Sequence, residues 1–415
     1  MDKLYEDART LIDKAIEANL PENAVKNALE NHVFSKNIYL VAIGKAAWRM
    51  AKSAHEELGE RIKGGIVLTK YGHSFGKIPK IEVIEAGHPI SDENTILGTQ
   101  KVVDLVKHLG VDDEVVFLVS GGGSALFELP LPGLELADII EINKELLSCG
   151  AAVLEINMIR KRLSSVKAGR FAQLCAPAKV FAVVLSDILG DRLDSIASGP
   201  AAPDFSTAED VLNVVKKYNL SLNDKLMAYL TKETPKELHN VETVITGSVR
   251  ILCESTASFA AELGYKPYIL ATEINCEARE AGRLIAAIAK QIDSGACAIK
   301  RPCAVIFGGE TVVKVKGTGK GGRNQELALA AAEGIAGIKD MVIFSVGSDG
   351  TDGPTDAAGG IVDGTTMARL KERDLSFSEI LDNNDSYNGL TKIDGLIITG
   401  PTGTNVNDVA VILCN

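Results

Sequence analysis

The stretch EVVFLVSGGGSALF at residues 114–127 joins an apolar run to a run of glycines and then to a helix-forming segment. Residues 114–121 are apolar on both alternating faces, which is typical of a strand buried in a parallel sheet. The turn Ser120–Ser124 contains three consecutive glycines, and such a run costs conformational entropy on folding without adding packing. The stretch therefore predicts a strand, a glycine-rich turn and a helix, a connection typical of α/β proteins.

Similar apolar runs alternate with helical periodicity on both sides of this stretch. Because each run is short, continuous and apolar on both faces, we expect a mainly parallel sheet covered by helices on both faces. The predicted strands are residues 38–44, 65–70, 80–87, 114–121 and 179–187.

A chain of 415 residues exceeds the length at which one hydrophobic core stops growing, so we expect two domains. The polar stretch around TKETPKELHN places the junction near residues 235–242, and we predict domains over 1–238 and 239–415. The near-contiguous runs 303–310 and 311–317 predict a hairpin, hence a mixed sheet in the second domain. Its other predicted strands are 241–247, 266–273, 341–349 and 409–415.

Charge and composition exclude several classes of function. The net charge is −11 and no long block of basic residues occurs, which argues against nucleic acid as a partner. The N-terminal segment carries acids where a signal peptide has bases, and no apolar run reaches the length of a membrane span. Seven cysteines without a Cys-x-x-Cys pair favour reduced thiols, so we expect a cytoplasmic protein.

In open α/β sheets ligands bind beyond the carboxyl ends of strands, so residues directly after strands are the first candidates for a site. Lys45 follows a predicted strand and Gly44, and it is either an anion-binding cation or a solvated lysine at a helix start. The turn formed by Ser120, Gly121, Gly122, Gly123 and Ser124 favours phosphate binding over a simple packing turn, because its backbone amides can approach an anion without Cβ clashes.

Acidic and basic residues add further candidates in the first domain. Asp187 ends a predicted strand and is the best candidate ligand for Mg²⁺, whereas Asp191 and Asp194 suit capping of their own loop. The basic cluster Arg160, Lys161, Arg162, Lys167 and Arg170 is read mainly as a solvated helix face, with Lys167 and Arg170 left open as site residues. His88 is assigned local hydrogen bonding, with a place at the site left open.

The second domain has its own polar loops after predicted strands. Glu310 and Arg323 flank a glycine-rich connection that opens a helix, and an arginine there offers a planar donor fork to a phosphate or carboxylate. Asp349 follows a buried strand and is the candidate general base for a hydroxyl group. Asn405 lies in the loop TGPTGTNVND and can donate to a ligand.

Taken in order, the segments IGKAAWRMA, AGHPISDEN, SGGGSALF, INMIRKRLSSVKAGR, SDILGDRLDSIASGP, GGETVVKVKGTGKGGRNQELALA, GSDGTDGPTDAAG and TGPTGTNVND form a set that spans nearly the whole chain. This ordered set resembles that of class II glycerate 2-kinases, the family with a MOFRL C-terminal region, some members of which are labelled hydroxypyruvate reductase. The resemblance implies a Rossmann-like N-terminal domain and a smaller mixed α/β C-terminal domain, with the active site in the cleft between them.

The resemblance also implies an activity: transfer of the γ-phosphoryl group of ATP to the 2-hydroxyl of D-glycerate with Mg²⁺. Lys45, Arg323, Asp349 and Asn405 are similar to the family's active-site residues, with Asp187 and Glu310 as supporting acids. The expected partners are D-glycerate and ATP, without nucleic acid or membrane, and a homodimer is one option for assembly.

Two other functions are weighed against this one. An NAD(P)-dependent hydroxypyruvate reductase would need a dinucleotide-binding GxGxxG with an acid about 20 residues further on, and the sequence has none. A non-catalytic protein that binds sugar acids or nucleotides would use the same anion sites without needing Asp349 as a base.

Overall fold

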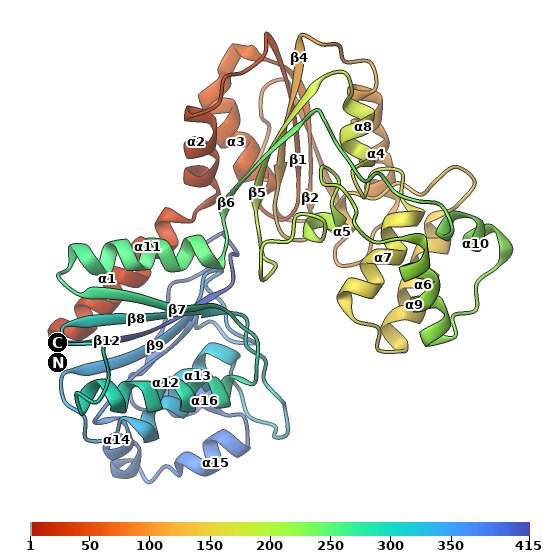
Figure 1. Cartoon of the computed structure of the whole chain (residues 1–415). Coiled ribbons are helices and arrows are strands. Elements are labelled where there is room, and N and C mark those ends of the chain that lie inside the picture. Colours follow the sequence, from red (N-terminus) through yellow and green to blue (C-terminus); the bar gives the residue numbers. More distant parts are fainter. Residues whose placement is uncertain (1) are drawn as a thin grey trace. The chain divides into compact units, whose positions relative to one another are not determined.

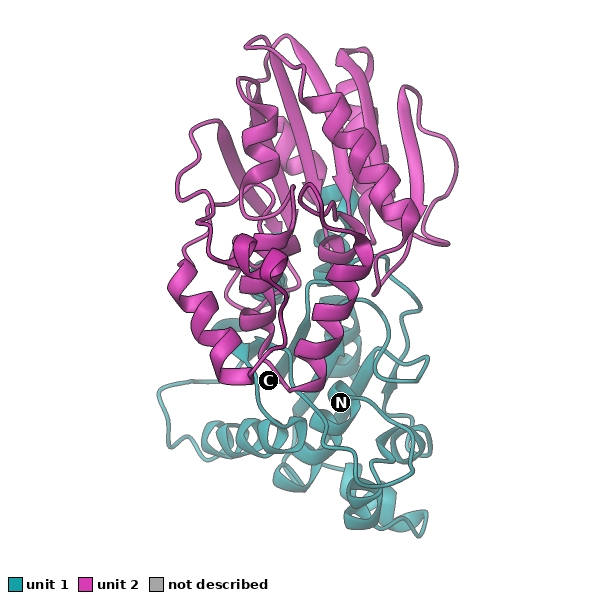
Figure 2. Ribbon diagram, turned by 90° about the vertical axis from the view of Figure 1, so that its right-hand side faces the viewer, with its two compact units in different colours: residues 1–23, 247–415 teal, residues 24–246 magenta. Residues whose placement is uncertain are grey.

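The computed structural model describes residues 2–415, and the chain divides into two compact units (Figure 2). Unit 2 comprises Ala24–Thr246, and unit 1 combines Gly247–Asn415 with the stretch that ends at Asn23. Each unit contains one six-stranded sheet. The predicted α/β fold with one mainly parallel and one mixed sheet is confirmed.

The sheet of unit 2 has the strand order β3-β2-β1-β4-β5-β6. The pairs among β1 to β5 are parallel, which leaves their carboxyl ends at one edge of the sheet. The strands are β1 (Asn37–Ile43), β2 (Ile62–Lys70), β3 (Ile81–Ala86), β4 (Asp113–Val119), β5 (Lys179–Leu185) and β6 (Val241–Gly247).

Alternate residues of these strands enter two different hydrophobic cores, as a sheet covered on both faces requires. In β1, Leu40 and Ala42 pack in one core with α2 (Pro21–Glu30) and α3 (Ala47–Leu58). Val41 and Ile43 pack in the other core with α4 (Glu93–Val106) and α8 (Arg170–Cys175).

A separate helical cluster belongs to unit 2 and has its own apolar core, which includes Leu146, Leu163 and Leu230. It contains α6 (Leu136–Ser148), α7 (Val153–Leu163), α9 (Ala208–Tyr218) and α10 (Asp224–Leu230), which lie together in Figure 1. The short helices α5 (Gly123–Leu126) and η2 (Ile196–Ser198) contact each other close to the end of β4, and η1 (Gly59–Arg61) leads into β2.

The sheet of unit 1 is mixed, with the order β11-β10-β9-β12-β8-β7. Only the β7–β8 pair among its pairings is parallel. The strands are β7 (Lys266–Ile274), β8 (Cys303–Gly309), β9 (Met341–Gly347), β10 (Gly359–Asp363), β11 (Leu396–Ile397) and β12 (Asp408–Cys414).

Helices cover both faces of this second sheet (Figure 1). One face packs against α1 (Asp2–Ala18) and α11 (Val249–Glu262). The other face packs against the remaining helices, chiefly α12 and α13, which pack closely on each other. These helices are α12 (Ala278–Asp293), α13 (Arg323–Gly334), α14 (Thr366–Glu372), α15 (Phe377–Asp382) and α16 (Ser386–Thr391).

Three sequence predictions differ from this fold. The hairpin of 303–310 and 311–317 does not form: β8 ends at Gly309, and Val312 makes a single parallel bridge to Glu277. The segment 241–247 is the last strand of the first sheet, since it pairs with β5, so the predicted boundary at 238/239 precedes it. The chain before Ala24 belongs to unit 1 because α1 buries its apolar face against α11 and the second sheet.

Within residues 2–415, no helix combines the length and the apolar character needed to cross a membrane.

Candidate active site

The carboxyl ends of the parallel strands in unit 2 lie side by side. Ile43 at the end of β1 is in register with Leu68 of β2 and with Val119 at the end of β4. Val119 is in turn level with Val184 of β5. Residues that directly follow these strands therefore share one edge of the sheet, where α/β proteins bind their ligands.

The loop after β4 is tied to the loop after β1 by hydrogen bonds. The Ser120 amide donates to Ile43 O (3.0 Å), and the Lys45 amide donates to Gly121 O (2.9 Å). Ser120 Oγ, which is buried, accepts from the Ala46 amide at 3.1 Å. A Cβ atom at Gly44 would lie only 2.3 Å from Ser120 Oγ, so this approach requires glycine.

The glycines of the loop leave room for three polar side chains. A Cβ atom at Gly121 would lie 2.3 Å from Asp187 Oδ2. At Gly122, where φ is +84°, it would lie 2.9 Å from His88 Nε2 and 3.2 Å from Lys45 Cε. In the part of the chain that the structure describes, the amides of Gly121 and Gly122 have no hydrogen-bond acceptor. The loop therefore offers free N–H donors that are bordered by a lysine, an imidazole and a carboxylate, a suitable arrangement for a phosphate.

The charged groups around this loop influence one another. Burial raises the pKa of Asp187, and the nearby Lys45 ammonium acts in the opposite direction. Lys45 is half-buried, and its ammonium forms no ion pair with any residue between 2 and 415. An unpaired cation beside free amides favours the binding of an anion.

Basic side chains from the ends of β2 and β3 also lie near the glycine loop. His88 comes directly after β3, and burial, followed by the charges of Lys45, Lys70 and His73, lowers its pKa. Lys70 ends β2, and His73 Nδ1 lies 3.1 Å from Lys45 O. Their positions just after strands were the available signal, the same one that identified Lys45.

Ser124, at the far end of the glycine loop, is anchored inside the protein. Its Oγ lies 2.7 Å from Ser198 Oγ. Its carbonyl oxygen accepts from Arg160 Nη2 (3.0 Å) and from Lys167 Nζ (2.8 Å). Lys167 is fully buried and also lies 3.4 Å from Glu128. Arg160 and Lys167 therefore support the glycine loop through the carbonyl of Ser124.

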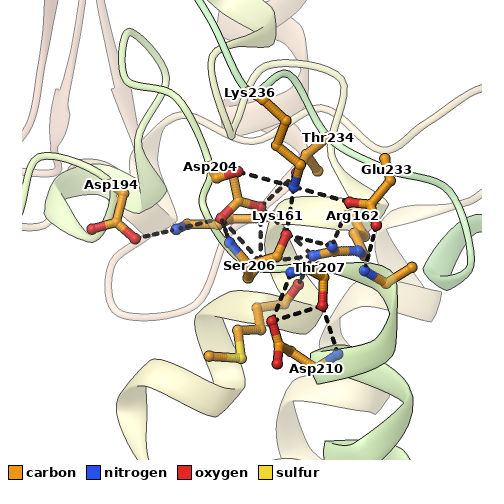
Figure 3. A network of polar contacts seen from close by, with 12 residues as sticks. Lys161, Arg162, Asp194, Asp204, Ser206, Thr207, Asp210, Glu233, Thr234 and Lys236 are labelled. Atoms are coloured by element: carbon orange, nitrogen blue, oxygen red, sulfur yellow. Dashed lines mark hydrogen bonds and ion pairs between the residues drawn. The ribbon is translucent and has the colours of Figure 1, made fainter.

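The rest of the basic cluster forms a buried network, so a solvated helix face is the wrong interpretation for it (Figure 3). Lys161 Nζ contacts Asp194 (3.0 Å) and the fully buried Asp204 (3.3 Å). Arg162 donates to Ser206 Oγ at 2.9 Å and lies 3.6 Å from Asp204. Buried charges must be paired, and here the pairs connect α7 to the loop before α9.

Arg170, which the sequence left open as a site residue, has a structural role as well. Its Nη1 donates to the carbonyl oxygen of Ser164 at 2.8 Å and to that of Lys161. The guanidinium therefore ties α8 to the end of α7.

Unit 1 gathers its predicted site residues at one edge of its own sheet. Asp408, the first residue of β12, is in register with Gly309 of β8 on one side and Gly347 of β9 on the other. Glu310 and Asp349, which follow those strands, are therefore its neighbours at that edge. Asp408 lies in the segment TGPTGTNVND, whose sequence alone gave it no predicted role.

Arg323 is held in a fixed orientation by two carboxylates. Its Nε and Nη2 donate to the two oxygens of Asp408 at 2.5 and 3.0 Å, and Nη1 lies 3.3 Å from Glu310. Asp408 is buried, whereas a third of the Arg323 side chain stays exposed. A guanidinium held along one edge presents its remaining donors in a defined direction.

The N-terminus of α13 is capped by the carboxylate of Asp352. The carboxylate of Asp352 accepts from the amides of Asn324 (3.1 Å) and Gln325 (2.9 Å). Asp352 is buried, and burial raises its pKa to about 6. A protein carboxylate thus satisfies the amides that an anionic ligand would otherwise bind.

Asp349 and Asn405 lie on two loops that are bonded together. The Ser348 amide donates to Asn407 O (3.0 Å), and the Thr402 amide donates to Asp349 O (3.2 Å). Asp349 is half-buried, and its Oδ1 accepts from the Thr351 amide at 3.0 Å. Asn405 Oδ1 accepts from the Asn407 amide at 3.2 Å. Both side chains are accessible and have further hydrogen-bonding capacity.

Comparisons with known proteins agree over the whole chain. Residues 7–231 match the family model described as a domain of unknown function, DUF4147, and residues 303–408 match the MOFRL family. The D-glycerate 2-kinase of Thermotoga maritima is 53% identical over 410 residues, which cover 99% of this chain and 98% of that protein. The glycerate 2-kinase of Pyrococcus horikoshii is 38% identical over 426 residues, covering 97% and 96%.

The crystal structure of the Thermotoga maritima glycerate kinase has the same fold, with a TM-score of 0.97 at 53% identity over 100% of both chains. Similarity of this extent, in sequence and in structure, shows common descent along the full length. The chain therefore belongs to the glycerate 2-kinase family, with a DUF4147 region over residues 7–231 and a MOFRL region over residues 303–408.

Proposed function

We propose that this protein transfers the γ-phosphoryl group of ATP to the 2-hydroxyl oxygen of D-glycerate, giving 2-phosphoglycerate, ADP and a proton. The observation that carries the proposal is the 53% identity to a D-glycerate 2-kinase over 99% of the chain. The same proposal places the reaction in the cytoplasm, where free thiols such as the seven cysteines of this chain stay reduced.

In unit 2 the glycine loop binds the phosphate groups of ATP. The free amides of Gly121 and Gly122 donate to phosphate oxygens, and the Lys45 ammonium beside Gly122 neutralises charge on them. The hydroxyls of Ser120 and Ser124 are engaged with Ala46 and Ser198, so these serines shape the loop more than they bind ligand.

In unit 1 the strand-end residues act on the acceptor substrate. Asp349 accepts the proton of the attacking hydroxyl group, since its carboxylate is accessible and only one of its oxygens is bound by the Thr351 amide. Arg323 binds the anionic oxygens of the substrate, with Asp408 and Glu310 fixing its plane. Asn405 donates a hydrogen bond to the substrate from its amide nitrogen.

Asp187 is the residue that would hold Mg²⁺. Its carboxylate lies directly beside Gly121, where the phosphates would bind. Mg²⁺ is usually bound by one or two carboxylates together with substrate phosphates and water, so a single carboxylate at this place fits the ion. No group of three metal-binding side chains occurs within residues 2–415. When bound, Mg²⁺ would neutralise phosphate charge.

The proposal is tested by identifying the product. The protein is incubated with ATP, Mg²⁺ and either D- or L-glycerate, and ³¹P NMR distinguishes 2-phosphoglycerate from 3-phosphoglycerate. We expect 2-phosphoglycerate from D-glycerate in amounts equal to the ADP formed. The Arg323→Lys and Arg283→Lys proteins are compared in the same assay. Arg283→Lys is the control, because Arg283 forms only an exposed ion pair with Glu280.

A parallel reaction separates the competing functions. When the protein is incubated with hydroxypyruvate and NADH or NADPH, the absorbance of the reduced nicotinamide should not fall. Oxidation of the nicotinamide without formation of phosphoglycerate would establish a reductase instead. Tight nucleotide binding without any turnover of D-glycerate would indicate a non-catalytic binding protein.

A further inference from the structure

His88 occupies a place at the glycine loop that the roles above leave unused. It directly follows Gly87 after β3, and its Nε2 faces Gly122, where a Cβ atom would approach it to 2.9 Å. Gly122 is also the residue beside Lys45 Cε. The imidazole and the lysine therefore border the same free amide of the loop.

The surroundings of the ring are rich in positive charge. Lys45 comes from the end of β1, and Lys70 and His73 come from the end of β2; all three lower the pKa of His88 in addition to its burial. Two acids also lie at this edge, and the Asp92 carboxylate would come within 3.1 Å of a Cβ atom at Gly87, the residue before His88. Asp187 is beside Gly121, and the Asp92 carboxylate accepts from the Tyr71 hydroxyl at 2.7 Å.

No protein group uses the hydrogen-bonding capacity of this ring. Among residues 2–415, neither nitrogen of His88 has a hydrogen-bond partner. By contrast, His73 Nδ1 is occupied by Lys45 O at 3.1 Å, and His32 Nε2 by the Glu114 carboxylate at 2.6 Å. A half-buried imidazole without a partner, beside a loop with free amides, is placed to meet a ligand.

We propose that His88 is a ligand-binding residue: its Nε2–H donates to an anionic oxygen bound over Gly122, and the ring takes up a proton when that oxygen arrives. The inference rests on the proposed function, because it needs an anion in the glycine loop. The anionic oxygen belongs to a nucleotide phosphate or to the carboxylate of glycerate, and both have the same chemistry at this position.

The proton uptake follows from charge alone. Without ligand, the cations Lys45 and Lys70 disfavour a further positive charge on the ring. An anion within hydrogen-bonding distance reverses this balance and favours the imidazolium form. Binding near neutral pH should therefore remove protons from solution, and affinity should rise as the pH falls towards 6.

Isothermal titration calorimetry tests this directly. ADP with Mg²⁺ and D-glycerate are titrated separately into the full-length protein at one pH near 6.5, in several buffers of different ionisation enthalpy. The slope of the observed enthalpy against the ionisation enthalpy gives the number of protons taken up. Uptake with ADP alone identifies a phosphate oxygen, and uptake with D-glycerate alone identifies the carboxylate.

Two substitutions separate hydrogen bonding from protonation. Glutamine places an amide donor near the position of Nε2 but cannot be protonated, so His88→Gln should keep most of the affinity and lose the proton uptake. His88→Ala should also lose about tenfold or more in affinity, since a hydrogen bond to a charged group is removed. His239→Asn is the control, because His239 is 87% exposed and should change neither quantity.

Proton uptake by the His88→Gln protein equal to that of the unaltered protein would overturn the inference, and so would unchanged affinity in His88→Ala. Circular dichroism and melting temperature confirm that each variant is folded. If the unaltered protein binds neither ligand, the proposed function fails, and this inference falls with it. Binding without proton uptake in the unaltered protein refutes the inference alone.

Discussion

Arg323 and Asp408 form a two-pronged ion pair, in which Nε and Nη2 of the guanidinium donate to the two carboxylate oxygens at 2.5 and 3.0 Å. The pair joins the first residue of α13 to the first residue of β12, in a sheet where Asp408 also lies level with the ends of β8 and β9. The orientation of Arg323 therefore depends on the register of the sheet.

Arg323→Lys should reduce kcat/KM for D-glycerate by about 100-fold, because lysine keeps the charge but loses the planar fork. Steady-state kinetics measures this loss, and Arg283→Lys on the surface of unit 1 should behave like the unaltered protein. Asp408→Asn should lower activity in the same direction, because it releases one side of the Arg323 fork. Full activity of both Arg323→Lys and Asp408→Asn would contradict the assigned role.

Gly122→Ala should weaken ADP binding by tenfold or more. Its Cβ would meet His88 Nε2 at 2.9 Å and Lys45 Cε at 3.2 Å, so it would displace the groups that border the loop. Gly150→Ala is the matched control, since Gly150 also has a positive φ (+73°) but open space around its Cβ position. Both variants should lose about 1 kcal/mol of stability from left-handed backbone strain, and only Gly122→Ala should lose affinity in calorimetry.

Asp349→Asn should lower kcat by about 10²- to 10⁴-fold, the usual contribution of a general base, with little change in the Kd for ADP or D-glycerate. Asp356→Asn is the control for loss of a carboxylate in the same loop, because the Asp356 carboxylate is already bound by the Tyr387 hydroxyl at 2.6 Å. Rapid-quench kinetics and equilibrium binding measure the two effects. Unchanged turnover in Asp349→Asn would rule out the base.

The stability of unit 1 should depend on pH through Asp352. Burial raises the pKa of this carboxyl from 3.8 to about 6, so the folded state favours the protonated form. The contribution of Asp352 to the free energy of unfolding is therefore complete below about pH 4 and is lost as the pH rises through 6. A pKa shift of this size corresponds to about 3 kcal/mol.

Urea unfolding followed by circular dichroism at pH 4.5 to 7.5 measures this contribution as the difference between the unaltered protein and Asp352→Asn. Groups that titrate in both proteins cancel in that difference. As the pH rises, we expect the free energy of unfolding of the unaltered protein to fall relative to that of Asp352→Asn. A difference that is constant or changes in the opposite direction would show that Asp352 is not protonated near pH 6.

Prediction from the sequence was most accurate where a structure depends on residues that are close together along the chain. The apolar runs predicted β1 to β5 within a few residues, because strands buried on both faces need continuous apolar side chains. It failed where partners lie far apart along the chain. Nothing local to residues 311–317 shows that Val312 makes a single bridge to Glu277 and that the segment does not turn back on β8. Likewise, nothing local to α1 shows that it packs on α11.

The candidate site shows the same division. Lys45, Gly121 and Asp187 were each identified from their place after a strand, and the structure brings them around one loop. The place of His88 was left open by the sequence, because only the parallel order of β3, β2, β1 and β4 carries it to Gly122. Arg160 was interpreted as a solvated cation and Lys167 was left open as a site residue, yet both side chains are bound to the carbonyl oxygen of Ser124.

By itself, the sequence determined the α/β class, the glycine turn at Ser120–Ser124, and the residues that follow each buried strand, because these depend on side-chain polarity and backbone freedom over a few positions. Which carboxylates already have partners follows from the packing of the folded chain. Asp408 holds Arg323 and Asp352 caps α13, while Asp187 stays beside the free amides of the glycine loop. The reason is physical: the pairing of charges depends on sheet register and burial, and both arise only when distant segments pack together.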